Sequence, residues 1–205
     1  MTKYLVSACL ILALTSAMAQ AKDQKPGVER WAIKTTVAKT VPSPTPIDFD
    51  KFIGLSDPPS AAHNNPNFQK TRYQGEDQIV SVRGYVFLVA GESDGDYHIQ
   101  ISNNPTSGDQ CIVVEVPKDD PIYVPDQSVR EQAGVVRQLI REKLLHGREP
   151  SSTGSVIQHP PYMEFTGGLF FDDAHVGDPP RGKKGMHAAT LWEIHPVIAA
   201  RFIKP

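Results

Sequence analysis

Hydrophobic and polar positions alternate along a series of short segments in the second half of the chain. In the first of them, Val80, Val82 and Val86 share one face, and polar residues occupy most of the other. The alternating pattern recurs in residues 78–91, 96–102 and 111–117. Gly, Asn, Pro and Asp separate these segments, which together predict three strands of an antiparallel meander.

The period of the pattern then lengthens to that of an amphipathic helix over residues 127–146. Val129, Ala133, Val136, Ile140 and Leu144 recur about one turn apart. Ser128 followed by Glu131 has the spacing of a capping box, and Gly147 stands where helices commonly end. The sequence therefore predicts one well-defined helix after the third strand.

Two further strands are predicted at residues 162–173 and 189–203. Three strands, a helix and two strands is the element order of an OB-fold, a small five-stranded barrel. We therefore predict a mainly β protein, with an OB-fold-like barrel and one α-helix between strands 3 and 4. In that fold the second, third and fifth strands are neighbours.

Composition divides the chain into three predicted parts. Residues 1–21 have the charged start, apolar centre and small-residue end of a signal peptide. Residues 22–75 are rich in proline and polar residues and predict an extended arm, in which the apolar residues of "ERWAIKTTVA" could pack onto a domain surface. Residues 76–205 hold the barrel domain.

The predicted leader determines the expected location and redox chemistry. Its apolar run is too short to span a bilayer and no later segment is a better candidate, so we expect a periplasmic or extracellular protein without a transmembrane segment. Removal of the leader would delete Cys9 and leave Cys111 alone, which excludes an intrachain disulfide. The formal charge of −2 gives no general attraction for nucleic acid, so an anionic partner would have to be bound locally.

The polar face of three predicted neighbouring strands carries an unusual set of side chains. Alternation on each strand puts Asp96, His98, Glu115, Glu193 and His195 on one outer face. One interpretation is a half-exposed sheet with cross-strand pairs, each contributing about 0.2 to 1 kcal/mol. The other is a functional site, because imidazole and carboxylate groups bind transition metals and act as general acids and bases.

A second group of candidate residues lies in the loop between the last two strands. Asp172 and His175 are three residues apart, a spacing at which a turn can direct both side chains to one ion, and basic residues follow. In OB-folds this loop borders the ligand-binding face. A solvated, charged loop is the alternative interpretation.

These patterns lead to a hypothesis for each role. The predicted ligands of a divalent ion, zinc or manganese, are His98, Asp172, His175 and His195. The predicted catalytic carboxylates are Glu115, Glu193 and Asp96. The predicted contacts to an anionic substrate are Arg181, Lys183 and Lys184.

Several short strings of the chain resemble a family of exported bacterial proteins of unassigned function. The strings are "GDYHIQI", "VVEVP", "GGLFFDDAH" and "WEIHPV", and they stand in the family's order. The resemblance runs from about residue 29 to 198 and implies that the family's motif positions are Asp96, His98, Glu115, Asp172, His175, Glu193 and His195. The sequence departs from the family after His175, where the loop is more basic.

Two functions from different classes remain open at this stage. One is a divalent-metal-dependent hydrolase that acts on phosphodiesters, in which the bound ion would lower the pKa of its water. The other is a non-catalytic binding module for an oligonucleotide, a glycan or a protein. The sequence contains no phosphate-binding Gly-rich loop, paired-cysteine zinc motif or Gly-x-Ser-x-Gly elbow.

Overall fold

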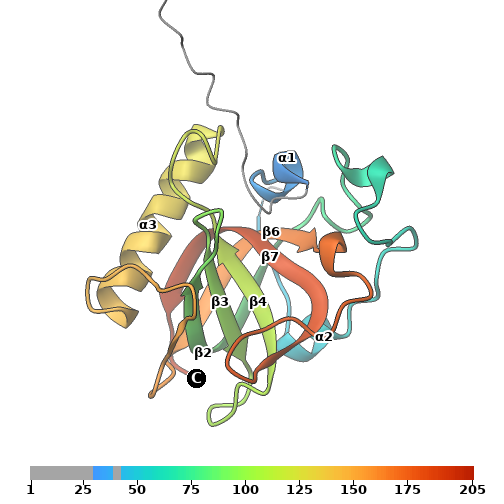
Figure 1. Cartoon of the computed structure of the whole chain (residues 1–205). Coiled ribbons are helices and arrows are strands. Elements are labelled where there is room, and N and C mark those ends of the chain that lie inside the picture. The colour runs from blue at the N-terminus through green and yellow to red at the C-terminus, as the bar shows by residue number, and fades with distance from the viewer. Residues whose placement is uncertain (1–29, 39–42) are drawn as a thin grey trace, which may run out of the picture.

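The computed structural model describes residues 30–38 and 43–205, and the predicted leader lies outside these residues (Figure 1). Five of the strands and one of the helices are long, and the other elements are short. The strands are β1 (Thr45–Pro46), β2 (Ile79–Gly91), β3 (Tyr97–Ser102), β4 (Gln110–Val116), β5 (Ser155–Val156), β6 (Tyr162–Phe171) and β7 (His187–Phe202). The α-helices are α1 (Trp31–Lys34), α2 (Phe49–Ile53) and α3 (Gln127–Leu144). Single 3-10 turns occur at Pro66–Phe68 and Asp173–His175.

The seven strands form one sheet with the order β1-β2-β3-β4-β7-β6, and β5 pairs with β2. The pairing of β4 with β7 is parallel, whereas β2, β3 and β4 form the predicted antiparallel meander. Strand β2 also pairs with β6, so the hydrogen-bonded neighbours make a closed circuit. The mainly β class, the position of the long helix and the neighbourhood of the second, third and fifth long strands are confirmed.

Alternation along the strands correctly separated the core face from the polar face. Tyr97, Ile99 and Ile101 of β3 pack in one hydrophobic cluster with the apolar faces of β4, β6 and β7 and with α3. Helix α3 packs against β7 and β4, along one side of the sheet in Figure 1. In the pairing of β2 with β3, the register shifts between Val86 and Leu88.

The N-terminal segment contributes to the same core. Phe49 and Phe52 of α2 and Tyr73 are buried among the strand side chains. The apolar string predicted to pack onto the domain does so as a helical turn, α1, with Ile33 buried. Residues 43–75 therefore cover the sheet rather than extend away from it.

The N-cap of α3 is not the residue that the sequence pattern predicts. Asp126, not Ser128, accepts the capping hydrogen bond, from the backbone N–H of Val129 at 3.1 Å. We expect Asp126→Ala to lower the free energy of unfolding by about 1 kcal/mol, because this N–H then loses its acceptor. Ser128→Ala is the matched control, and chemical denaturation should show it within about 0.5 kcal/mol of wild type. A larger effect of Ser128→Ala would contradict the assignment.

Candidate metal site

The polar face of β3, β4 and β7 is buried, contrary to the expected outer surface. Asp96, His98, Glu115, Glu193 and His195 are each 2% exposed or less. Helix α1 reaches these side chains through Lys34, and the loop between β6 and β7 reaches them through Arg181. The backbone N–H of Lys183, in the same loop, donates to the neighbouring Gln100. Buried charged groups lower the stability of the folded protein unless they are paired, so each charge in this cluster is expected to have a partner.

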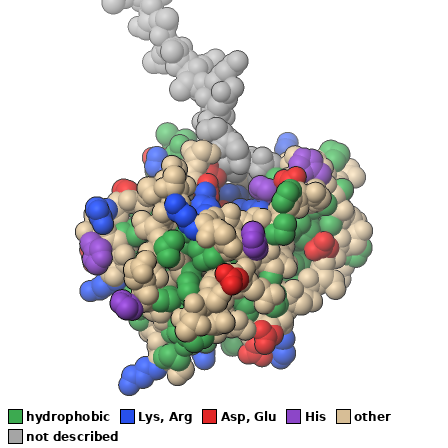
Figure 2. All heavy atoms as spheres, turned by 60° about the horizontal axis from the view of Figure 1, so that its bottom comes forward, with side chains coloured by type: hydrophobic (Ala, Val, Ile, Leu, Met, Phe, Trp, Pro, Cys, Tyr) green, Lys and Arg blue, Asp and Glu red, His purple; other side chains and the backbone are tan. Residues whose placement is uncertain are grey.

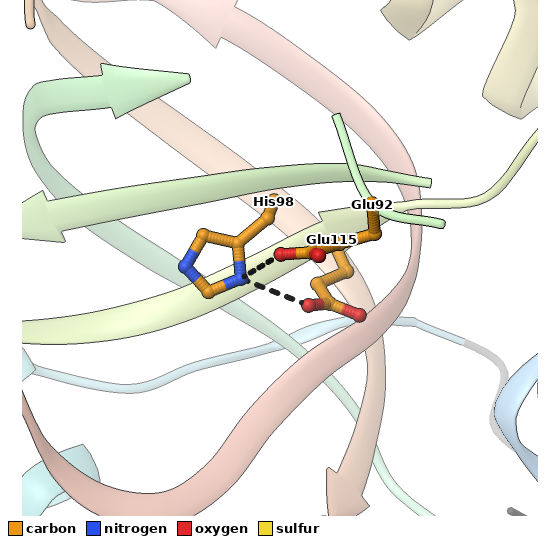
Figure 3. Close-up of side chains that lie close together, drawn as sticks. All are labelled: Glu92, His98 and Glu115. Carbon is orange, nitrogen blue, oxygen red and sulfur yellow. Dashed lines mark hydrogen bonds and ion pairs between the residues drawn. The ribbon is translucent and has the colours of Figure 1, made fainter. Parts of the chain in front are cut away.

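The first group of side chains that could hold a metal ion consists of Glu92, His98 and Glu115. His98 and Glu115 are direct cross-strand partners on β3 and β4. The Nδ1 atom of His98 lies 3.0 Å from Oε1 of Glu115 and 3.5 Å from Oε1 of Glu92. Figure 3 shows both carboxylates directed at this one nitrogen.

The second group consists of Asp96, Glu115 and His195. The Nε2 atom of His195 lies 3.0 Å from Oδ2 of Asp96 and 3.5 Å from Oε2 of Glu115. Glu115 therefore contributes one oxygen to each group. Ligand atoms about 2.1 Å from one ion lie roughly 3.0 Å apart at octahedral angles and roughly 3.4 Å apart at tetrahedral angles. The separations in both groups are compatible with ligation.

The surroundings of each histidine determine which of its nitrogens carries a proton. Nδ1 of His195 contacts the backbone carbonyl of Lys34, which can only accept, so Nδ1 is a donor. The backbone N–H of Lys183 donates to Gln100 at 2.7 Å, which identifies the accepting atom as the amide oxygen Oε1. Because this oxygen can only accept, Nε2 of His98, 3.2 Å away, is the donor. The other nitrogen of each ring, Nδ1 of His98 and Nε2 of His195, faces carboxylate oxygens. In a neutral ring this nitrogen would carry a lone pair, which cannot donate to those oxygens. Either a proton or a metal ion must therefore lie between these groups.

Lys34 is the main positive charge of the cluster, and the sequence pattern did not identify it. Its Nζ atom lies 3.2 Å from Glu115, 3.3 Å from Asp94 and 3.6 Å from Asp96. Burial alone would lower the pKa of Lys34, but the charges of these three carboxylates outweigh it and raise the pKa above its ordinary value. Conversely, Lys34, the His98 hydrogen bond and Arg181 outweigh burial and hold the pKa of Glu115 well below its usual range.

Negative charge exceeds permanent positive charge in the described part of the cluster. The permanent cations are Lys34, Arg181 and Lys183, and their carboxylate partners are Glu92, Asp94, Asp96, Glu115, Asp172 and Glu193. Six carboxylates against three cations leave an excess of negative charge, which protonated histidines, a protonated Asp94 or bound metal ions could offset; burial raises the pKa of Asp94. A site of this composition fits a divalent transition metal.

The loop after β6 covers the cluster and lines a pocket of about 440 Å³ together with Lys34, His98 and Glu115. Nδ1 of His175 lies 2.6 Å from Oδ2 of Asp172, whose hydrogen bond raises the pKa of His175. Asp173 also lines the pocket, and its Oδ1 atom is buried without a hydrogen-bond partner among the described residues. Most of the residues that line the pocket are polar or charged.

Three basic residues of this loop were predicted to bind an anion, and they lie in different surroundings. Arg181 contacts Glu193, lies 2.5 Å from Asp172 and is 3.5 Å from Glu115. Lys183 lies 3.1 Å from Glu92, whereas Lys184 is exposed and is not among the residues that line the pocket. Two of the three cations therefore border the pocket, both already paired with carboxylates.

The predicted ligand residues do not meet at one point. His98 and His195 belong to the two separate groups, each completed by carboxylates. Among the described His, Cys, Asp and Glu residues, no group of three joins Asp172 or His175 to either set. The carboxylates predicted for catalysis, Glu115 and Asp96, lie among the potential ligands instead, and their roles stay predictions.

Cys111 lies beside this cluster but lacks the environment of a nucleophile. Its side chain is fully buried and accepts a hydrogen bond from Nε2 of Gln100 at 3.4 Å. Burial raises the pKa of Cys111 to about 11, which keeps the thiol protonated at neutral pH. Thiolate chemistry is therefore not favoured here.

Comparison with known proteins adds no identity: no family model and no curated protein matches this chain. The described part of the chain contains no helix long and apolar enough to cross a membrane. On the face shown in Figure 2, basic and acidic side chains are interspersed, without a large area of one sign.

Proposed function

We propose that this protein binds a divalent transition metal ion, zinc or manganese, through Glu92, His98 and Glu115. The observation that carries the proposal is the orientation of His98. Its Nε2 donates a hydrogen bond to Gln100. Its Nδ1 lies 3.0 Å from Glu115 and 3.5 Å from Glu92, separations that ligands of one ion can have. Metal-bound histidines commonly donate their other N–H to such an oriented acceptor. The pocket gives solvent a route to this group.

We further propose that the bound metal supports hydrolysis of a phosphodiester by an exported enzyme with an OB-fold-like barrel. The ion would lower the pKa of a bound water towards neutrality. His175, oriented by Asp172 and partly exposed at the pocket, is suited to accept the proton of that water. Arg181 and Lys183 line the same pocket and would stabilise the negative charge of the substrate.

The closed circuit of strand pairings and the parallel pairing of β4 with β7 support the barrel assignment. The leader pattern supports export to the periplasm or the extracellular medium. The resemblance to exported bacterial proteins agrees with the barrel and with export, although it supplies no reaction.

A non-catalytic binding module is the second candidate. The observation that favours it is that Arg181 and Lys183 are already paired with carboxylates, so a substrate phosphate would compete with those pairs. Tyr97 packs in the core, so it is not available as a platform for stacking bases. An oligonucleotide is therefore a less suitable ligand than a glycan or a protein.

The test is metal analysis combined with turnover of bis(4-nitrophenyl) phosphate. We expect the purified full chain to bind Zn²⁺ or Mn²⁺, to lose the ion held by Glu92, His98 and Glu115 when His98 is replaced by alanine, and to cleave the ester only when metal is present. His175→Ala should keep the metal and lose at least tenfold in kcat, since a positioned base typically contributes 10²-fold or more. His187→Ala, an exposed histidine of the same region, is the control and should match wild type.

The two proposals can fail separately. A protein that binds no metal, and whose melting temperature does not respond to Zn²⁺ or Mn²⁺, would overturn both. Metal binding without turnover would overturn the hydrolase proposal and put the binding module first.

A further inference from the structure

We infer that Glu115 is a bridging ligand and that the cluster holds two metal ions, the second bound by Asp96, Glu115 and His195. This inference rests on the proposed metal site and extends it to a dinuclear centre. The two oxygens of Glu115 point to different histidines, Oε1 to His98 at 3.0 Å and Oε2 to His195 at 3.5 Å. A carboxylate bound in this way holds two ions close together, as in two-metal hydrolases, where the ions lie about 3.5 to 4 Å apart.

The second group has the same design as the first. His195 donates through Nδ1 to the carbonyl of Lys34, which leaves Nε2 facing Asp96 and Glu115. Asp96 is held in place because its other oxygen, Oδ1, accepts from the backbone N–H of Lys118 at 3.0 Å. Both groups thus present an oriented imidazole nitrogen to an oriented carboxylate, and the side chains of Asp96 and His195 are fully buried.

The Lys34 ammonium stands beside the oxygens that the second ion would use. It lies 3.2 Å from Oε2 of Glu115 and 3.6 Å from Oδ2 of Asp96. A second ion would therefore compete with this ammonium, which is on a flexible side chain that lines the pocket. We expect the second ion to bind more weakly than the first, and its affinity to rise when Lys34 is replaced by methionine.

The experiment is a titration of metal-free full-length protein with Mn²⁺, followed by native mass spectrometry and electron paramagnetic resonance. Wild type should take up two ions in sequence and show the spectrum of a spin-coupled Mn²⁺ pair. Glu92→Gln and Asp96→Asn should each bind one ion and lose the coupled spectrum. Asp96→Asn keeps the shape of the side chain and an oxygen for the Lys118 N–H, which favours a folded variant. His187→Ala should again match wild type.

The outcomes separate this inference from the proposed function. One ion in wild type, unaffected by Asp96→Asn, would overturn the dinuclear centre and leave the first site standing. Two ions without spin coupling would overturn Glu115 as the bridge. If no ion binds to wild type under any of these conditions, both the dinuclear centre and the proposed metal site are overturned. Circular dichroism of each variant confirms that a lost ion reflects a lost ligand in a folded protein.

Discussion

Arg30→Met is expected to lower the free energy of unfolding by about 3 to 5 kcal/mol, the usual cost of removing one partner from a buried ion pair. Arg30 binds both oxygens of Glu76, at 2.7 and 2.5 Å, and neither side chain is exposed. Its remaining N–H groups donate to the backbone carbonyls of Phe68, Thr71 and Phe171. Methionine preserves much of the aliphatic volume but leaves the Glu76 carboxylate and these carbonyls without this donor.

Chemical denaturation of the full chain measures this effect, with Arg201→Met as the matched control. Arg201 also pairs with a glutamate, Glu164, but its side chain is 67% exposed and Arg83 binds the same carboxylate. We expect the control to change stability by about 1 kcal/mol or less. Equal effects of the two substitutions would show that Arg30 does not anchor the N-terminal segment to β6.

The long strands of the sheet were predictable because their buried and polar residues alternate with a period of two. Val82, Ile99 and Ile101 alternate with polar residues, and the change to a helical period at residue 127 predicts the element order. The N-terminal segment was not predictable in the same way. Its contacts depend on single residues such as Arg30 and Phe52, and no periodic pattern distinguishes these from a polar, proline-rich linker.

The candidate site was only partly predictable for a related reason. Alternation assigned His98, Glu115 and His195 to one face, because each strand fixes its own parity. Parity does not reveal what covers that face, so the burial of the cluster was missed. Parity assigns Gln100 to this face but does not show that it orients the His98 ring. Glu92 lies in the turn between β2 and β3, where no alternation assigns a face, and Lys34 reaches the cluster from α1, which is distant in sequence. The string "ERWAIKT", which contains Lys34, was the only signal.

Lys34→Met tests the charge balance of the cluster and should have an effect of similar size. Without metal, we expect the free energy of unfolding to fall by about 3 to 5 kcal/mol, because Asp94, Asp96 and Glu115 lose a common cation in a buried place. Zn²⁺ or Mn²⁺ should restore much of this loss, since an ion can supply the missing positive charge. Thermal melts with and without a chelator measure both effects. The matched control is Lys51→Met, whose side chain is 76% exposed and which should stay within about 0.5 kcal/mol of wild type.

The same variant has an expected pH dependence whose sign follows from Glu115. In wild type the pKa of Glu115 is held below its ordinary value, where burial is outweighed by Lys34 and its other partners. This contribution to stability is fully present above the unfolded pKa, about 4.3, and is lost as the pH falls through the folded pKa. Since Lys34→Met removes part of that contribution, the gap between the metal-free proteins should be widest near neutral pH and should narrow in acid. A gap that stays constant from pH 7 to pH 3 would mean that Lys34 stabilises the fold through packing of its aliphatic chain. Metal ions would then give the variant no more stabilisation than they give wild type.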